Sequence, residues 1–114
     1  MADENQPSYS VLCSACYTPC SGAEAHVIPR WNPEVRRVLT TYRCGNCWLQ
    51  SLSQLRESVT SGEAEVLSSF CDFLSRHGYG KDAETIRAAS FAKQQTHLLA
   101  IVDAVQAGDI TFGP

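Results

Sequence analysis

Two short cysteine motifs decide the fold of this chain: Cys13-Ser-Ala-Cys16, the first knuckle, and Cys44-Gly-Asn-Cys47, the second knuckle, with 27 residues between them. A gap of two residues lets both sulfurs of one motif face the same point. Two such motifs together supply the four soft thiolate ligands that tetrahedral Zn²⁺ prefers. We therefore predict one zinc ion per chain, bound by Cys13, Cys16, Cys44 and Cys47.

The predicted zinc site is structural rather than catalytic. Four protein thiolates fill a tetrahedral coordination sphere, so no open position remains for water or substrate. The chain has two further cysteines. Cys20 follows the first knuckle closely enough to replace one of its ligands, and both arrangements fit the spacing. Cys71 lies within an apolar helical pattern and is expected to be an inert buried thiol.

The length and composition indicate a small folded protein that needs its metal. At 114 residues the chain suits one compact unit, and its hydrophobic share of 44% with a charged share of 18% is ordinary for folded proteins. A structural zinc contributes on the order of 10–16 kcal/mol of apparent binding energy, comparable to the whole stability of a domain. Removing the metal should therefore unfold residues 13–47.

The termini and the cysteine usage favour a cytoplasmic location. Met1 to Pro7 is polar and acidic, without the basic start and apolar run of a secretory signal. The longest apolar run, Leu98 to Val102, is too short to span a bilayer. We expect a cytoplasmic protein with no membrane contact, in which thiols stay reduced and paired cysteines bind metal or perform redox work.

Two strands are predicted between the knuckles. Ala25 to Ile28 has the composition of a short strand, which Pro29 is expected to end, and Asn32-Pro-Glu34 should reverse the chain. Val35 to Arg43 then alternates in the manner of a strand and delivers Cys44 to the metal. Residues 17–22 have turn chemistry.

The order knuckle, strand, turn, strand, knuckle resembles the zinc-ribbon family over residues 11–48. The resemblance implies a β-hairpin fixed by a Cys₄ zinc site. It says little about activity, because ribbons occur in transcription factors, ribosomal proteins, polymerases and enzyme accessory domains.

The second knuckle leads directly into helical periodicity. One helical stripe is formed by Trp48, Leu52, Leu55 and Val59. The sequence Thr60-Ser-Gly-Glu63 fits a capping box, which predicts a second helix ending near His77-Gly78. The apolar side of that helix comprises Val66, Leu67, Phe70, Cys71, Phe73 and Leu74.

Helical spacing continues to Gly108. Asp82 is placed to cap a third helix through Ile86 and Ala89. The positions of Leu98, Ile101, Val102 and Val105 extend the helical pattern. One continuous helix and two helices broken near Ser90 both fit this pattern.

These elements predict an α+β protein. Its parts are a flexible N-terminus at residues 1–10, a zinc ribbon at 11–48, a packed region of two to four helices at 49–109, and a short tail at 110–114. The stripes of the helices should pack on one another and on the hairpin, with Trp48 and Phe70 in the core and Ile110 and Phe112 docking from the tail.

A second resemblance concerns His26. The run from the first knuckle through His26-Val-Ile-Pro-Arg30 to the second knuckle is similar to zinc-braced HNH endonucleases, which implies that His26 would activate water beside a divalent ion. Those nucleases carry an acidic residue where this chain has Ala25, and an asparagine where it has Trp48. Without oxygen and nitrogen ligands the catalytic ion could not be held. His26 is therefore a weak catalytic candidate, and a degenerate or active nuclease is an alternative.

A third interpretation is redox chemistry at the second knuckle. Cys44 and Cys47 follow a strand and precede a helix, whose N-terminus can lower a thiol pKa. This local arrangement resembles thioredoxin-like proteins. Those proteins need a βαβ framework, and no strand is predicted after Cys47.

The function that this sequence favours is non-enzymatic: a small zinc-stabilised module that binds another protein, in a regulatory or accessory role. Its contact face is predicted at Arg30, Arg36, Arg37 and Arg43. Nucleic acid is a weaker candidate partner, because the formal net charge is −3 and four thiolates around Zn²⁺ add about two more negative charges.

Overall fold

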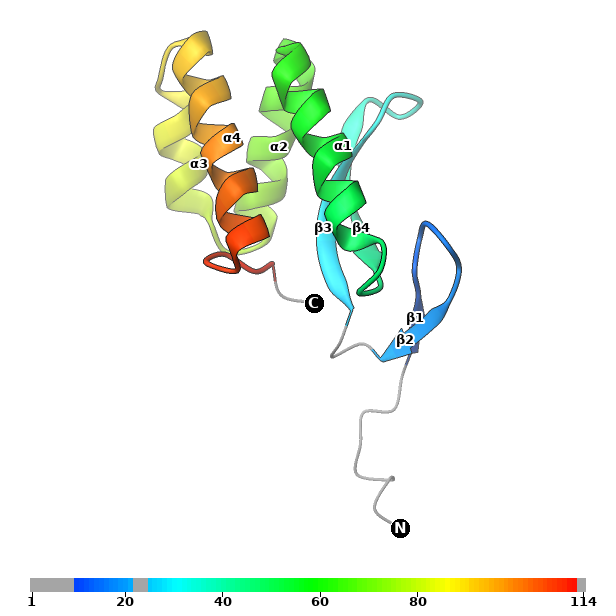
Figure 1. Cartoon of the computed structure of the whole chain (residues 1–114). Coiled ribbons are helices and arrows are strands. Elements are labelled where there is room, and N and C mark those ends of the chain that lie inside the picture. The colour runs from blue at the N-terminus through cyan, green and yellow to red at the C-terminus, as the bar shows by residue number, and fades with distance from the viewer. Residues whose placement is uncertain (1–9, 22–24, 113–114) are drawn as a thin grey trace.

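A computed structural model describes residues 10–21 and 25–112 of the chain. It contains two antiparallel hairpins followed by four helices, so the predicted α+β class is confirmed. Figure 1 shows the longer hairpin lying against the helices, while the shorter hairpin lies at its end, beside the start of the first helix. The elements are β1 Ser10–Leu12, β2 Pro19–Ser21, β3 His26–Asn32, β4 Arg37–Arg43, α1 Trp48–Ser61, α2 Ala64–Arg76, α3 Gly80–Arg87 and α4 Phe91–Ala107.

The longer hairpin is the one predicted between the knuckles. Strand β3 pairs with β4 from His26↔Arg43 to Asn32↔Arg37. Its turn is fixed by the side-chain oxygen of Asn32, which accepts hydrogen bonds from the backbone N–H groups of Glu34 and Val35 at 2.8 and 3.3 Å. This is the local bonding that makes Asn a turn former.

Pro29 does not end β3, and that prediction was wrong. Pro29 is buried and lies opposite Thr40 in the middle of the hairpin. In a two-stranded sheet each strand has one edge without a partner, where the missing N–H of proline leaves no ladder bond unmade. The apolar surface of Pro29 can therefore be buried inside a strand.

The shorter hairpin was not predicted. Strand β1 pairs with β2 through Val11↔Cys20, and the first knuckle lies in the connection between them. Residues 17–22 were expected to be a turn, but Pro19–Ser21 is extended. Strands of three residues are too short to show a period of two. The predicted flexible N-terminus lies outside the described residues, except for Ser10, which begins β1.

Helices α1 and α2 carry the predicted apolar stripes, but their junction differs from the prediction. The capping box at Thr60-Ser-Gly-Glu63 is wrong because α1 continues to Ser61 and ends at Gly62, whose φ of 74° lies in the left-handed region. Glu63 precedes α2 and makes no side-chain capping bond. Thr60 is thus helical and cannot serve as an N-cap.

Residues 80–107 form two helices rather than one. Ser90 separates them, and its side chain accepts a hydrogen bond from the backbone N–H of Lys93 at 3.4 Å, as expected of an N-cap. Asp82 lies in the first turn of α3 and is not its cap; the helix starts earlier, after Tyr79. In the residues that the structure describes, no helix is both long and apolar enough to cross a membrane.

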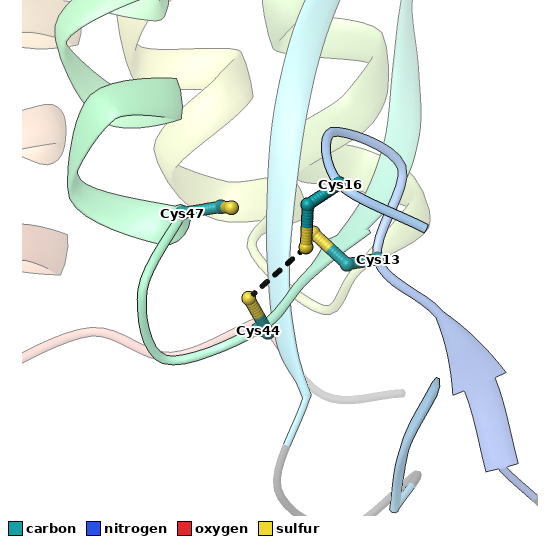
Figure 2. A group of neighbouring side chains, drawn as sticks. All are labelled: Cys13, Cys16, Cys44 and Cys47. Carbon is teal, nitrogen blue, oxygen red and sulfur yellow. Dashed lines mark hydrogen bonds between the residues drawn. The ribbon is translucent and has the colours of Figure 1, made fainter. Parts of the chain in front are cut away.

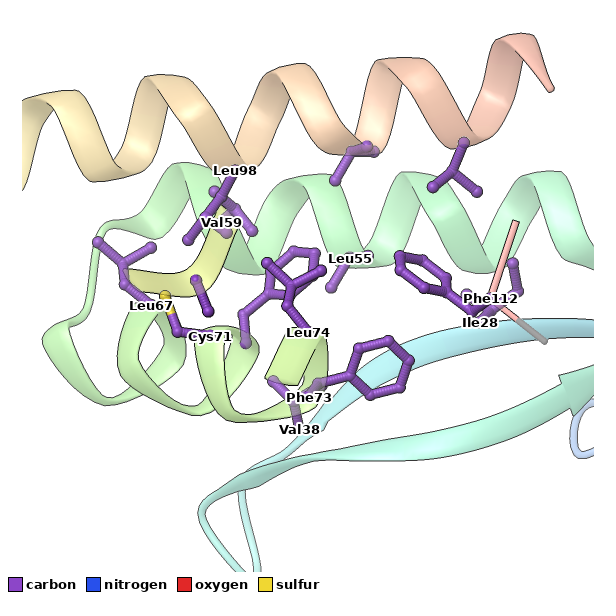
Figure 3. Close-up of a cluster of buried hydrophobic side chains, with 14 of the residues drawn as sticks. Ile28, Val38, Leu55, Val59, Leu67, Cys71, Phe73, Leu74, Leu98 and Phe112 are labelled. Atoms are coloured by element: carbon purple, nitrogen blue, oxygen red, sulfur yellow. The ribbon is translucent and has the colours of Figure 1, made fainter. Parts of the chain in front are cut away.

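One hydrophobic core lies between the helices and the longer hairpin (Figure 3). The predicted stripe of α2 is wholly buried, and Leu52, Leu55 and Val59 of α1 face it. Trp48 is only partly buried and packs at the border of the core.

The C-terminal tail also contributes to the core. Phe112 is 4% exposed and meets the rings of Phe73 and Tyr79 edge-on, at centroid distances of 5.0 and 5.7 Å.

Because Phe112 is buried against two aromatic rings, we expect Phe112→Ala to lower the free energy of unfolding by about 3–5 kcal/mol. Phe91→Ala is the matched control, since Phe91 is 48% exposed and its truncation leaves a much smaller cavity. Urea denaturation of both variants measures the difference. Equal losses of stability would contradict the docking of the tail.

Candidate metal centre

The structure brings the four knuckle cysteines together. Their Sγ atoms all lie within 4.8 Å of one another, and those of Cys16 and Cys44 are 3.7 Å apart. Figure 2 shows the sulfurs pointing toward a common centre from the loop after β1, the end of β4 and the start of α1. Four thiols arranged in this way could hold a metal ion.

The first knuckle is shaped by a tight turn and attached to β4. The backbone N–H of Cys13 donates to Thr18 O at 3.0 Å, and that of Tyr17 donates to Cys13 O at 2.8 Å. Tyr17 has a φ of 62°, which closes the turn. The backbone N–H of Ser14 donates to Tyr42 O at 2.8 Å, so the knuckle is fixed to the strand that carries the second knuckle.

The second knuckle is the start of α1. The carbonyl of Cys44 accepts the backbone N–H groups of Cys47 and Trp48 at 3.1 and 3.2 Å, and the carbonyl of Cys47 then accepts the first helical bond, from Ser51. Cys47 is the N-cap of α1. The positive end of the helix dipole favours a thiolate at this position, and the neighbouring thiols oppose it.

The thiols differ in how readily they ionise. Burial alone would raise the pKa of Cys13, but the backbone N–H groups of Cys44, Cys16 and Ala15 lower it to about 6. The neighbouring Cys44 thiol, followed by desolvation and the other two thiols, raises the pKa of Cys47 to about 12. Negative charge therefore accumulates on some of the sulfurs and suppresses ionisation of the last one. A cation at their centre would remove this repulsion and permit four thiolates.

Arg43 is buried beside the cysteines, so its prediction as part of an exposed contact face was wrong. It is only 2% exposed. Its Nε donates to the hydroxyl of Ser51 in α1, and Nη1 donates to Tyr42 O at 3.5 Å. Burial lowers the pKa of its guanidinium, while negative charge on the nearby thiols, Cys13 above all, favours the protonated form. A buried cation is costly without such compensation, and its charge would in turn offset the excess negative charge of four thiolates around a divalent ion.

The three other predicted contact arginines are exposed but do not share one site. Arg36 and Arg37 border a hollow between the hairpin and α2. Arg30 borders a separate hollow beside α1, together with Trp31 and Pro33. The predicted face of four arginines is therefore divided into three environments.

The remaining cysteines lie apart from the centre. Cys20 donates its thiol to Val11 O at 3.6 Å, within the shorter hairpin, and does not belong to the group of four. Cys71 is buried in the core, where desolvation raises its pKa, so the expectation of a buried thiol is confirmed.

His26 packs on the second knuckle. Its ring stacks on Trp48 with centroids 4.4 Å apart and an interplanar angle of 6°, and burial lowers its pKa. Across residues 10–21 and 25–112, the four cysteines are the one group of three or more His, Cys, Asp or Glu side chains that could hold a metal. A second, oxygen-rich metal site next to His26 is thus not part of the described structure.

Two residues were missed by the sequence analysis: Ser51, which bonds to Arg43, and Arg76, at the hollow on α2. Ser51 falls three residues after Trp48, on the buried stripe of α1, so its helical position was a usable signal for burial. Arg76 joins Arg36 and Arg37 at the hollow on α2. Nothing in the sequence relates Arg76 to residues about 40 positions earlier, because only the packing of α2 on β4 brings them together.

Comparison of the chain with family models, with curated proteins and with solved structures finds no match. The candidate metal centre therefore rests on the geometry of its four thiols.

Arg43→Gln removes the buried positive charge, and we expect it to weaken metal affinity by about 10-fold to 100-fold, as is typical for residues that support metal ligands. Titration with Co²⁺ under reducing conditions, followed by its thiolate absorption bands, measures the change. Arg37→Gln is the matched control because Arg37 is exposed and lies away from the thiols. Equal affinities for the two variants would contradict a charge-compensating role for Arg43.

Proposed function

We propose that this chain is a small zinc-stabilised interaction module that binds another protein and performs no catalysis itself. One observation carries this proposal: all four candidate ligands are cysteine thiols that converge from the shorter hairpin, the end of β4 and the start of α1. We further propose a cytoplasmic location, where thiols stay reduced and available to metal.

The identity of the metal is argued from the donor set and its spacing. With Zn–S bonds of about 2.3 Å, the edges of a regular tetrahedron measure about 3.8 Å. The Cys16–Cys44 sulfur distance of 3.7 Å fits this edge, and the spread of up to 4.8 Å needs only small side-chain adjustments. Four thiolates favour zinc over harder cations such as Mg²⁺ or Ca²⁺. The resemblance to zinc ribbons supports the same choice.

A structural role is supported by what the metal would connect. The hairpin of β1 and β2 has three residues in each strand, too few for independent stability in water. It contacts β4 through the backbone bond from Ser14 to Tyr42. A metal shared by Cys13, Cys16, Cys44 and Cys47 would fix this small hairpin to the rest of the protein and leave no coordination position for a substrate.

The alternative functions have less support. For a nuclease, His26 would have to face a divalent ion, yet its ring is stacked on Trp48. For a thioredoxin-like protein, a strand should follow Cys47, whereas helices make up the described chain from Trp48 to Ala107. For a nucleic-acid binder, the formal net charge of −3 opposes contact with a phosphate backbone.

Metal analysis of protein purified under reducing conditions tests the zinc centre. We expect one zinc per chain and four thiols that become reactive only after chelation. Cys47→Ser should abolish stoichiometric zinc, while the matched control Cys20→Ser should retain it, because Cys20 lies outside the group of four. Zinc-free protein with a reversible disulfide between Cys44 and Cys47 would support redox chemistry instead. Metal-dependent nicking of plasmid DNA that is lost in His26→Ala would support a nuclease.

Partner capture tests the interaction role. Immobilised zinc-loaded protein should retain a specific protein from a lysate of its source, identified by mass spectrometry. Cys47→Ser should retain less of it, because loss of the metal is expected to unfold residues 13–47, which include Arg36 and Arg37. Cys20→Ser again serves as the control for the loss of a thiol. Equal capture by both variants would show that the contact does not depend on the metal.

A further inference from the structure

A hollow of about 360 Å³ lies where the turn end of the longer hairpin meets α2. We call it the arginine hollow. Its walls include Arg36 and Arg37 from the hairpin, and Glu65, Ser68, Asp72 and Arg76 from α2. It lies away from the metal centre, which is at the other end of β4.

The arginine hollow carries excess positive charge. Its two carboxylates are already neutralised, since Glu65 pairs with Arg36 and Asp72 pairs with Arg87 of α3. Arg37 and Arg76 form no ion pair within the part of the chain that the structure describes. The hollow is therefore locally cationic on a chain whose formal net charge is −3.

The side chain of Arg76 is restricted by two contacts before any ligand binds. One of its Nη2 hydrogens is donated to Val38 O at 3.2 Å, and its guanidinium carbon lies 5.8 Å from the centre of the Phe73 ring. A guanidinium has five N–H donors, so this single bond leaves most of them available. Because both contacts restrict the side chain before binding, less rotamer entropy is lost when an anion is captured.

We propose that the arginine hollow binds an acidic segment of a partner protein, with carboxylate side chains placed on Arg37 and Arg76. This inference rests on the proposed interaction function and specifies the chemistry of the partner. Arginine binds carboxylates through two parallel hydrogen bonds, which gives orientation as well as affinity. The hydroxyl of Ser68 adds a neutral donor in the wall of the hollow.

A peptide fits this hollow better than a nucleic acid. The excess positive charge of the hollow comes from two arginines, Arg37 and Arg76, which matches a few separate carboxylates on a peptide better than a continuous row of phosphates. Among the described residues, none that lines the hollow is aromatic, so these residues offer no platform for stacking an unpaired base.

The test uses zinc-loaded full-length protein and a fluorescein-labelled ten-residue peptide of alternating Glu and Gly, measured by fluorescence anisotropy. We expect binding at low salt that weakens as ionic strength rises. The double substitution Arg37→Gln and Arg76→Gln should weaken it by about tenfold or more. The matched control is Arg30→Gln, which removes an exposed arginine of the same hairpin outside the hollow and should leave binding unchanged.

Arg37→Glu is a second variant, which leaves the hydrogen bond of Arg76 to Val38 O and its contact with the Phe73 ring intact. Arg37 is exposed, so its charge reversal should preserve the fold and still weaken peptide binding. The inference is overturned by no binding at low salt, by equal losses in Arg30→Gln and Arg37→Glu, or by tighter binding of a single-stranded oligonucleotide of ten bases. Zinc content is measured on the same samples. If the protein contains zinc but does not bind the peptide, this inference alone is overturned. If the purified protein contains no zinc, the proposed function is overturned.

Discussion

Mutual repulsion among four converging thiols is the constraint on which this structure depends. Their sulfurs lie within 4.8 Å of one another, at the junction of β4 and α1. Negative charge on that many adjacent sulfurs is unfavourable unless a cation lies between them. The hydrophobic core stabilises the helices and the longer hairpin by burial, but the short hairpin of β1 and β2 adds little apolar surface to it. A bound cation would thus stabilise one end of the molecule, while apolar burial stabilises the other.

Arg43 connects the group of four thiols with the packing of α1. It belongs to β4, lies next to Cys44 in the sequence, and donates to Ser51 on the buried face of α1. Its burial is unfavourable without the nearby thiolates, and the thiolates are less stable without its charge. Convergence of the four thiols and packing of α1 on β4 therefore support each other. The stacking of His26 on Trp48 adds a second contact between the same hairpin and the same helix.

Local patterns predicted much of this fold, and the failures have identifiable physical causes. The two-residue gap within each knuckle and the stripe of Leu52, Leu55 and Val59 are local patterns, so they could be interpreted directly. The pairing of β1 with β2 depends on three residues per strand and on anchoring by the knuckle, which no periodicity reveals. The burial of Arg43 and the approach of Arg76 to Arg37 are set by tertiary packing. Both sites thus depend partly on contacts that sequence spacing does not encode.

The four ligands are not equally accessible. Cys13 and Cys44 are buried, whereas Cys16 is exposed on the loop of the short hairpin. If the four thiols hold a metal ion, a competing thiol or chelator would therefore meet it first at Cys16, and stepwise displacement would begin on that side. Exchange of the ion would then depend on local opening of this loop as well as on the affinity of the complete site. An ion held in this way would be bound tightly at equilibrium and would still pass to another molecule on a short timescale.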